Sequence, residues 1–288
     1  MKIFSLCQNN RMSPICFLAP SQKASTYRGR LFDELSLAFK NPDFEQAKNI
    51  LAPSTSATVS DFLQALVEKT GEQALFEGLR SDYCLVDTGK TSRKAFADQN
   101  KKARKYIFKR DVFSIPIYAE QKANNNLYVP SAKEIALSLS LVPQKALGSI
   151  EKVKIYASYP SKDPRFLETK NAPYAEVIDG KTLAVYPQKE NRGQTKLDAA
   201  MIHEGGHFIS YHQFGNHMAS PHWQMWDTIM RKDHLYPSIY GSSHANEDFS
   251  EALVLYILTK GTELEALFKE NFRFRGQIFD QLFEASLA

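Results

Sequence analysis

The pentapeptide His203-Glu204-Gly205-Gly206-His207 is the feature that most constrains how this chain folds. Its two histidines are four residues apart, and that spacing puts both side chains on one face of a helix. Two imidazoles on one helix face can bind a single zinc ion, while the intervening glutamate reaches a water molecule held by the metal. The pattern therefore predicts a helix that carries a metal site. We expect Thr195 with Asp198 to cap its beginning.

A zinc site of this kind needs one more protein ligand, because catalytic sites keep three protein ligands and one open position. Glu247 and Glu251 are also four residues apart, on a second helix predicted to follow Ser242 or Ser243. We expect Glu247 to complete the site. Glu251 would then accept a hydrogen bond from a ligand imidazole and fix its tautomer. The alternative is that both glutamates are simply solvated on the helix face.

Two segments of the sequence, taken together, resemble motifs of a known protein family. The HExxH pentapeptide and the segment Asn246-Glu247-Asp248-Phe249-Ser250-Glu251 resemble the gluzincin metallopeptidases. About 40 residues separate His207 from Glu247, and Tyr240 lies seven positions before that glutamate. This layout is similar to the group of the anthrax lethal factor catalytic domain and the Pro-Pro endopeptidases. The resemblance covers residues 128 to 258 and does not extend to the first third of the chain.

The resemblance implies a role for each matching residue. His203, His207 and Glu247 would bind one zinc ion per chain. Glu204 would be the general base and acid, and Tyr240 would donate its phenol to the developing oxyanion. The chemistry agrees, since zinc lowers the pKa of its bound water and a phenol adds a donor to the tetrahedral intermediate. For the phenol's role, Tyr236, His234 and His244 lie nearby and remain alternatives, and Tyr240 could instead be a packing residue.

Two glycines inside a predicted helix are unusual, because each costs roughly 1 kcal/mol relative to alanine. Either crowding by a neighbouring element or a need for mobility could explain Gly205 and Gly206.

Local patterns elsewhere predict a helix, a strand and a hairpin. Ser131 and Glu134 form the pattern of a capping box at the start of an amphipathic helix. Apolar and polar residues alternate at 153–157, which predicts a half-buried strand. Asp179-Gly180 lies between two further predicted strands and is expected to form their hairpin turn. We expect this arrangement to lack a βαβ unit.

Hydrophobic periodicity suggests three parts. Residues 1–28 have little periodicity and are read as a mobile leader. Helical patterning from Leu31 to about Phe113 predicts a mainly helical N-terminal domain at 29–125. Residues 126–288 are expected to form an α+β domain, with a small mixed sheet and two helices that carry the ligands. Given the resemblance, the expected fold of this part is a zincin-like metallopeptidase domain.

Residues 90–110 form a basic segment. Between Lys90 and Asp111 the chain has nine Lys or Arg residues against two Asp, with aromatic residues among them. A solvated helix face is the ordinary meaning of such a run. Two other readings stay open: the segment could bind a polyanion, either nucleic acid or an anionic membrane surface, or it could dock an acidic protein substrate. Nucleic acid is not the expected partner.

Composition excludes several classes of protein. The chain has 288 residues and is 43% hydrophobic, enough to bury a substantial core. No apolar run is long enough for a transmembrane helix, and the beginning of the chain lacks a secretory signal pattern. The protein is expected to be cytoplasmic, or exported by a leaderless route into a target cell. Its three cysteines are too dispersed for a disulfide scaffold.

The expected function is zinc-dependent hydrolysis of peptide bonds in a protein or peptide substrate, as in an exported bacterial effector or toxin. One alternative is an inactive or non-proteolytic zincin. The other is a polyanion-binding module that uses residues 90–110.

Overall fold

The computed structural model describes residues 15–17, 76–96, 101–121, 126–160, 173–215, 220–233, 236–238, 240–261 and 264–284. These residues belong to two compact units, one built around a β-sheet and the other from helices. The sheet unit includes residues 81–140 and 150–191, and the helical unit includes residues 141–149 and those from 192 onward. The mixed α+β content agrees with the predicted fold class.

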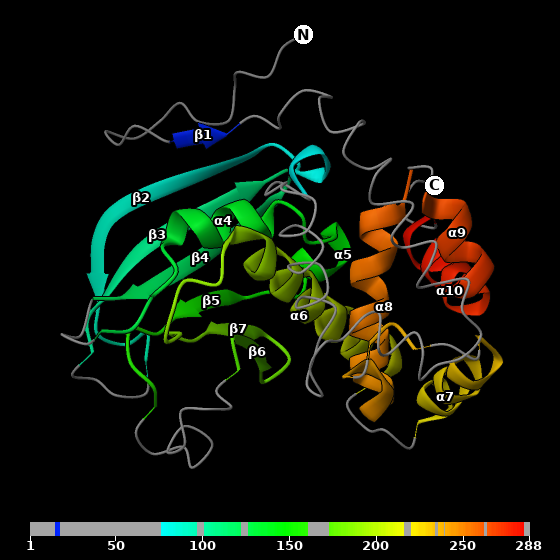
Figure 1. Ribbon diagram of the computed structural model, residues 1–288. Coiled ribbons are helices and arrows are strands. Elements are labelled where there is room, and N and C mark those ends of the chain that lie inside the picture. The colour runs from blue at the N-terminus through cyan, green and yellow to red at the C-terminus, as the bar shows by residue number, and fades with distance from the viewer. Residues whose placement is uncertain are drawn as a thin grey trace, which may run out of the picture. The chain divides into compact units, whose positions relative to one another are not determined.

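The strands of the described residues form one mixed sheet (Figure 1). In chain order they are β1 (Ile15–Phe17), β2 (Tyr83–Ser92), β3 (Ala103–Arg110), β4 (Phe113–Glu120), β5 (Lys152–Ile155), β6 (Ala175–Ile178) and β7 (Thr182–Val185). Their order across the sheet is β1-β2-β3-β4-β5-β7-β6. The pairs from β1 to β4 are antiparallel, β5 runs parallel to both β4 and β7, and β6 closes a hairpin with β7.

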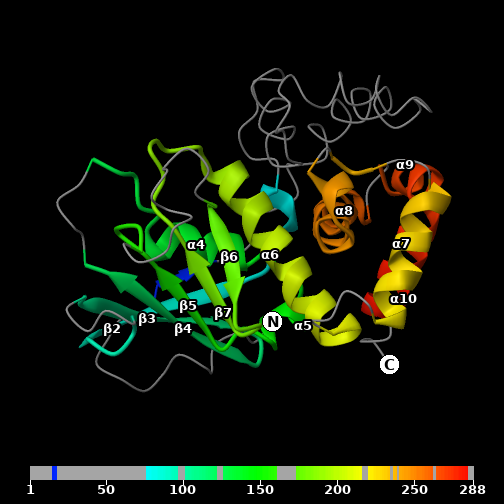
Figure 2. The same cartoon turned by 90° about the horizontal axis from the view of Figure 1, so that it is seen from below.

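One face of the sheet is buried. The strand register places on this face a set of apolar residues, none of which is more than 5% exposed: Leu85, Phe108, Ile115, Ile117, Val153, Ile155, Leu183 and Val185. Figures 1 and 2 show α4 (Ala132–Leu139) lying against the sheet. Its buried residues include Ile135 and Leu139, so the helix contributes an apolar side to the same unit.

Three local predictions in this unit are confirmed. Ser131 caps α4, and the side chain of Glu134 bonds back to the Ser131 backbone, which completes the capping box. Strand β5 alternates between half-buried and buried residues. The hairpin turn has positive φ at both Asp179 and Gly180, as a two-residue type I′ turn requires. These signals were readable because each depends on a few neighbouring residues.

Two predictions about the sheet unit are wrong. Residues 83–120 form β2, β3 and β4 and not helices. Neighbouring strands of this meander pair over most of their length, and cross-strand packing overrides a weak helical pattern. The chain from β4 through α4 to the parallel strand β5 is also a crossover connection, although no βαβ unit was expected.

The predicted division of the chain is only partly testable. The pairing of β4 with β5 crosses the boundary predicted between residues 125 and 126. The leader predicted at 1–28 lies outside the described residues except for β1, and so do the helical stretches predicted before residue 76.

The helical unit has a core of aromatic side chains. Its helices are α5 (Gln144–Leu147), α6 (Gln194–Phe214), α7 (Pro221–Asp233), α8 (Ala245–Thr259), α9 (Leu264–Asn271) and α10 (Arg273–Glu284), with short 3-10 turns η1 (Glu77–Leu79) and η3 (Gly241–Ser243). Helix α8 packs against α6, α7, α9 and α10. The aromatic residues that meet around it are Phe214, Trp223, Trp226, Phe249 and Phe279. None of the helices in the described part of the chain has the length and apolar character needed to cross a membrane.

Helices α6 and α7 begin differently, and the pair Thr195 and Asp198 does not cap α6 as expected. Helix α7 begins at Pro221, and the Ser220 hydroxyl accepts a hydrogen bond from the Trp223 backbone. Helix α6 begins one residue before Thr195, and its N-cap is Gly193, which offers no side-chain bond. Asp198 is buried inside the helix and does not cap it, because Arg80 and Gln194 bind its carboxylate.

Candidate metal centre

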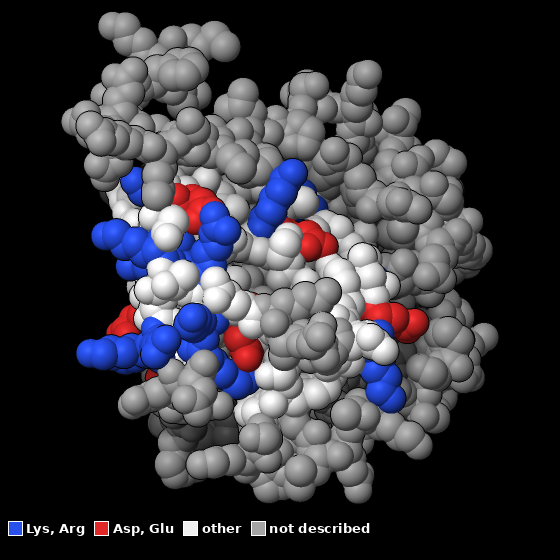
Figure 3. Space-filling model, turned by 90° about the vertical axis from the view of Figure 1, so that its left-hand side faces the viewer, with Lys and Arg blue, Asp and Glu red and all other residues white. Residues whose placement is uncertain are grey.

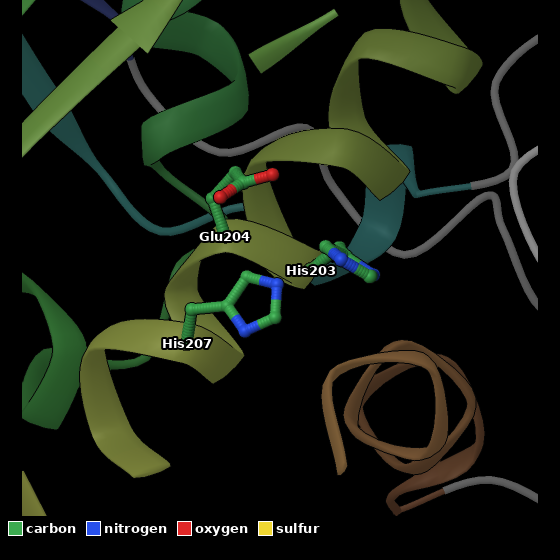
Figure 4. A group of neighbouring side chains, drawn as sticks. All are labelled: His203, Glu204 and His207. Carbon is green, nitrogen blue, oxygen red and sulfur yellow. The ribbon is translucent and has the colours of Figure 1, made fainter. Parts of the chain in front are cut away.

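Helix α6 carries the three residues of the HExxH motif in the middle of its length. Figure 4 shows His203, Glu204 and His207 on adjacent turns of this helix. The centroids of the His203 and His207 rings are 4.8 Å apart, and the two ring planes are nearly perpendicular. One ligand atom from each of the three residues lies within 4.8 Å of the others, and Glu204 and His207 are each 7% exposed. The group could hold a metal ion.

Helix α8 brings Glu247 to the two imidazoles. The Oε2 atom of Glu247 lies 3.2 Å from Nε2 of His203 and 3.4 Å from Nε2 of His207. This oxygen is buried, and among the described residues neither contact has the geometry of a hydrogen bond. Two ligand atoms on one tetrahedral zinc, each bound at about 2.0–2.1 Å, lie about 3.3–3.4 Å apart. The Glu247 oxygen is therefore spaced from both nitrogens as ligands of one ion are spaced.

The charges around His203 favour a cation in this position. Burial by itself would lower the pKa of His203, but contacts with Glu247 and Glu251 raise it well above its usual range. Burial would likewise raise the pKa of Glu247, yet the two imidazoles hold it far below the ordinary value. Three carboxylates thus surround two imidazoles, and this field stabilises positive charge, whether a proton or a metal ion.

The outer nitrogens of both imidazoles also meet residues of α8. Nδ1 of His203 lies 2.7 Å from Oε1 of Glu251, the contact expected from the sequence. Nδ1 of His207 lies 3.2 Å from Oγ of Ser250, a residue to which the sequence assigned no role. Hydrogen bonds at these outer nitrogens orient the rings and leave Nε2 free to bind a metal.

Tyr240 lies beside the group, at the start of η3. Its ring centroid is 6.0 Å from that of His203, and the side chain is 43% exposed. Partial burial, followed by the nearby charge of Glu247, raises the pKa of Tyr240 above its usual range. The phenol therefore keeps its proton and can act as a hydrogen-bond donor. A Cβ atom at Gly241 would lie 3.1 Å from Cγ of Pro237 and 3.3 Å from Oγ of Ser238, so the glycine leaves room for these residues of its own turn.

The alternatives to Tyr240 are differently placed. His244 is exposed and forms the N-cap of α8, with Nδ1 3.1 Å from Oγ of Ser243. Tyr236 is half-buried, and His234 lies outside the described residues.

The glycines of the motif are explained by crowding. A Cβ atom at Gly206 would lie 2.8 Å from both Cα and Oγ of Ser250 on α8. At Gly205 it would lie 3.2 Å from Cγ1 of Val142, just before α5. Helices cross this closely only where one of them lacks a side chain. Of the two explanations left open by the sequence, close packing is the one with a structural basis.

Two more residues beside the group were missed in the sequence. The Nδ2 atom of Asn246 donates to Oε1 of Glu247 at 3.1 Å. Tyr211 stacks on His207 with ring centroids 5.7 Å apart. Tyr211 lies four residues after His207 in α6, so helical spacing alone could have suggested the contact.

A buried ion network anchors the beginning of α8. Arg275 of α10 bonds through Nε and Nη2 to Asp248 at 2.8 and 2.7 Å, and through Nη1 to Asp233 of α7 at 2.9 Å. The indole of Trp226 donates to Asp248 at 2.9 Å. Arg275 and Asp248 are fully buried. Because Asp248 directly follows Glu247, this network holds the beginning of α8 against α7 and α10.

The basic segment is divided by the fold. Its residues lie on β2, on β3 and in the connection between them, so the predicted helix face does not exist. Arg104 pairs with Asp87, Lys101 lies 3.0 Å from Glu120, and the buried Arg110 donates to the Ser140 carbonyl at 3.0 Å. Figure 3 shows Lys and Arg side chains gathered on this side of the molecule with acidic side chains among them. Several of these cations are thus used within the fold.

Comparison of the chain with protein-family models, with curated proteins and with solved structures finds no match. The resemblance to the gluzincins therefore rests on the residues of the two motifs. What the structure adds is the placement of those residues around one point.

Proposed function

We propose that this chain is a zinc-dependent metalloendopeptidase of the gluzincin type. His203, His207 and Glu247 would hold one zinc ion. The observation that carries the proposal is the position of the Glu247 Oε2 atom, buried at 3.2 and 3.4 Å from the two Nε2 atoms. A carboxylate delivered to both imidazoles by another helix is what a three-ligand site requires.

The donor set favours zinc over other divalent ions. Two imidazole nitrogens and one carboxylate oxygen suit zinc, whereas calcium and magnesium prefer oxygen ligands alone. Three protein ligands leave one coordination position for water or substrate. When bound, zinc would supply Lewis acidity and lower the pKa of a bound water.

The remaining steps belong to side chains of this chain. Glu204 is adjacent to a ligand histidine and buried, so its carboxylate can take a proton from the attacking water and pass it to the leaving amine. Tyr240 keeps its proton and can donate a hydrogen bond to the oxyanion that forms at the scissile carbonyl. Glu251 holds the ring of His203 throughout. The substrate class is a protein or peptide.

The first experiment measures metal content. The protein is purified without added metal, and bound zinc is measured by elemental mass spectrometry for the wild type and Glu247→Ala. We expect about one zinc per wild-type chain and a sharp loss in the variant, because two imidazoles alone bind zinc poorly. Glu270→Ala, at an exposed position of α9, is the matched control and should keep its zinc. A wild type without zinc, even after reconstitution, would contradict the proposal.

The second experiment tests the reaction. Glu204→Gln should retain zinc and lose turnover of a peptide library, because the amide cannot accept the proton of the attacking water. Proteolysis retained in this variant would exclude the mechanism. Zinc bound by the wild type without cleavage of any peptide would identify the inactive zincin that the sequence left open.

A further inference from the structure

Two consecutive residues of helix α8 contact the Nδ1 atoms of the two proposed ligand histidines. Glu251 meets Nδ1 of His203 at 2.7 Å, and Ser250 meets Nδ1 of His207 at 3.2 Å. Ser250 is fully buried, and His207 is 7% exposed. The hydroxyl is therefore the partner that the fold presents to this nitrogen in a region shielded from water.

The contact depends on how closely the two helices cross. Gly206 directly precedes His207, and a Cβ atom there would lie 2.8 Å from Cα of Ser250. Any larger residue at position 206 would push α8 away from α6. The absence of a side chain at Gly206 thus lets the Ser250 hydroxyl reach the imidazole of the next residue.

We infer that Ser250 is the positioning residue for His207: its hydroxyl accepts a hydrogen bond from the Nδ1–H group, and Nε2 is thereby left available as a ligand. The inference rests on the proposed metal site and adds a residue to it. A neutral imidazole carries one proton, and an acceptor at Nδ1 selects the tautomer in which Nε2 has the free electron pair. Glu251 does the same for His203 with a charged group, so the two ligands are held by different chemistry.

The experiment measures zinc affinity by chelator competition for the wild type, Ser250→Ala and Ser210→Ala. Loss of a residue that orients a ligand histidine typically costs 10–100-fold in metal affinity. We expect a zinc Kd raised by at least about 10-fold in Ser250→Ala. Ser210 is the matched control, because it is equally buried and bonds at 3.2 Å to the backbone carbonyl of His207 and not to its ring. The zinc Kd of Ser210→Ala should stay within about 2-fold of the wild-type value. This change is well below the roughly 10–100-fold loss expected when an orienting residue is removed.

A second readout separates positioning from a general loss of stability. Nitrogen NMR of the zinc-loaded protein with labelled histidine reports which ring nitrogen of His207 carries the proton. We expect one Nδ1-protonated form in the wild type, and a Nδ1 signal in Ser250→Ala that is shifted and exchanges faster with solvent. Equal zinc affinities for Ser250→Ala and the wild type, or equal losses in both serine variants, would overturn the inference. A wild type that binds no zinc would instead overturn the proposed function.

Discussion

At the scale of single residues, the candidate centre is defined by where individual atoms of α8 and η3 meet α6. The two oxygens of Glu247 have different partners: Oε1 accepts from Asn246, and Oε2 faces the two imidazoles. The carboxylate is thereby held in one orientation, with its more exposed neighbour Tyr240 beside it. This position of Oε2 is the reason for proposing Glu247 as a ligand and Glu204 as the general base.

Tyr240→Phe tests the proposed oxyanion donor. Loss of one such donor costs roughly 10²–10³-fold in kcat, so peptide cleavage should fall by about this factor. The zinc content should not change, because the phenol is not a ligand. Kinetics and elemental analysis on the same sample check both expectations. Tyr236→Phe removes the alternative phenol and should leave kcat unchanged; if it lost activity while Tyr240→Phe kept it, the roles would be exchanged.

At the scale of elements, the site depends on the crossing of α6 and α8. Gly206 on α6 packs against the backbone of Ser250, and this contact sets the separation of the two helices that supply the proposed ligands. A glycine inside a helix is unfavourable by itself, so its presence here trades intrinsic helix stability for a close approach.

Gly206→Ala should destabilise the protein by about 1–3 kcal/mol, because overpacking at 2.8 Å outweighs the gain in helix propensity. Gly276→Ala is the matched control in α10, where the nearest atom lies at an ordinary 3.5 Å. There, helix propensity should dominate and raise stability by about 0.5–1 kcal/mol. Urea unfolding of both variants gives the two free energies. Two changes of the same sign would contradict the crowding explanation for Gly206.

The buried arginine network gives a second prediction at this scale. Arg275→Met leaves Asp233 and Asp248 as buried carboxylates without their counter-ion, a change that costs about 3–5 kcal/mol. Arg231→Met removes an exposed ion pair to Asp227, four residues away in the same helix, and should cost about 0.5 kcal/mol or less. Thermal unfolding monitored by circular dichroism compares them. Equal losses would mean that the Arg275 network does not anchor α8.

At the scale of the whole molecule, the described residues separate into a sheet unit and a helical unit, and all proposed ligands lie in the helical one. A ligand that binds only the folded state stabilises the elements that form its site. Zinc should therefore act mainly on α6 and α8, with smaller effects on the sheet.

Hydrogen exchange checks this distribution. At a zinc concentration about 1,000 times Kd, stabilisation is about 4 kcal/mol, so amides of α6 and α8 that exchange by unfolding of this unit should slow by up to about 10³-fold. Amides of β2, β3 and β4 should change much less. Magnesium at the same concentration is the control and should slow neither set. Equal protection of both units would show that they unfold together.

The sequence could predict the parts of the site that depend on local spacing. His203 and His207 share a helix face because they are four residues apart, and the same rule pairs Glu247 with Glu251. The capping box of α4 and the Asp179-Gly180 turn were equally local. Ser250 and Gly206 were visible in the sequence, but their contact joins residues that are 44 positions apart.

The sequence by itself therefore determined that a helix presents two imidazoles and a carboxylate, because backbone geometry over five residues is local. Only the tertiary structure decided that Glu247 faces both imidazoles and that residues 83–120 are strands and not helices. Strand pairing and helix crossing depend on partners far away in the chain. Their energies come from cross-strand packing and close contact between helices, which a local pattern of residues does not contain.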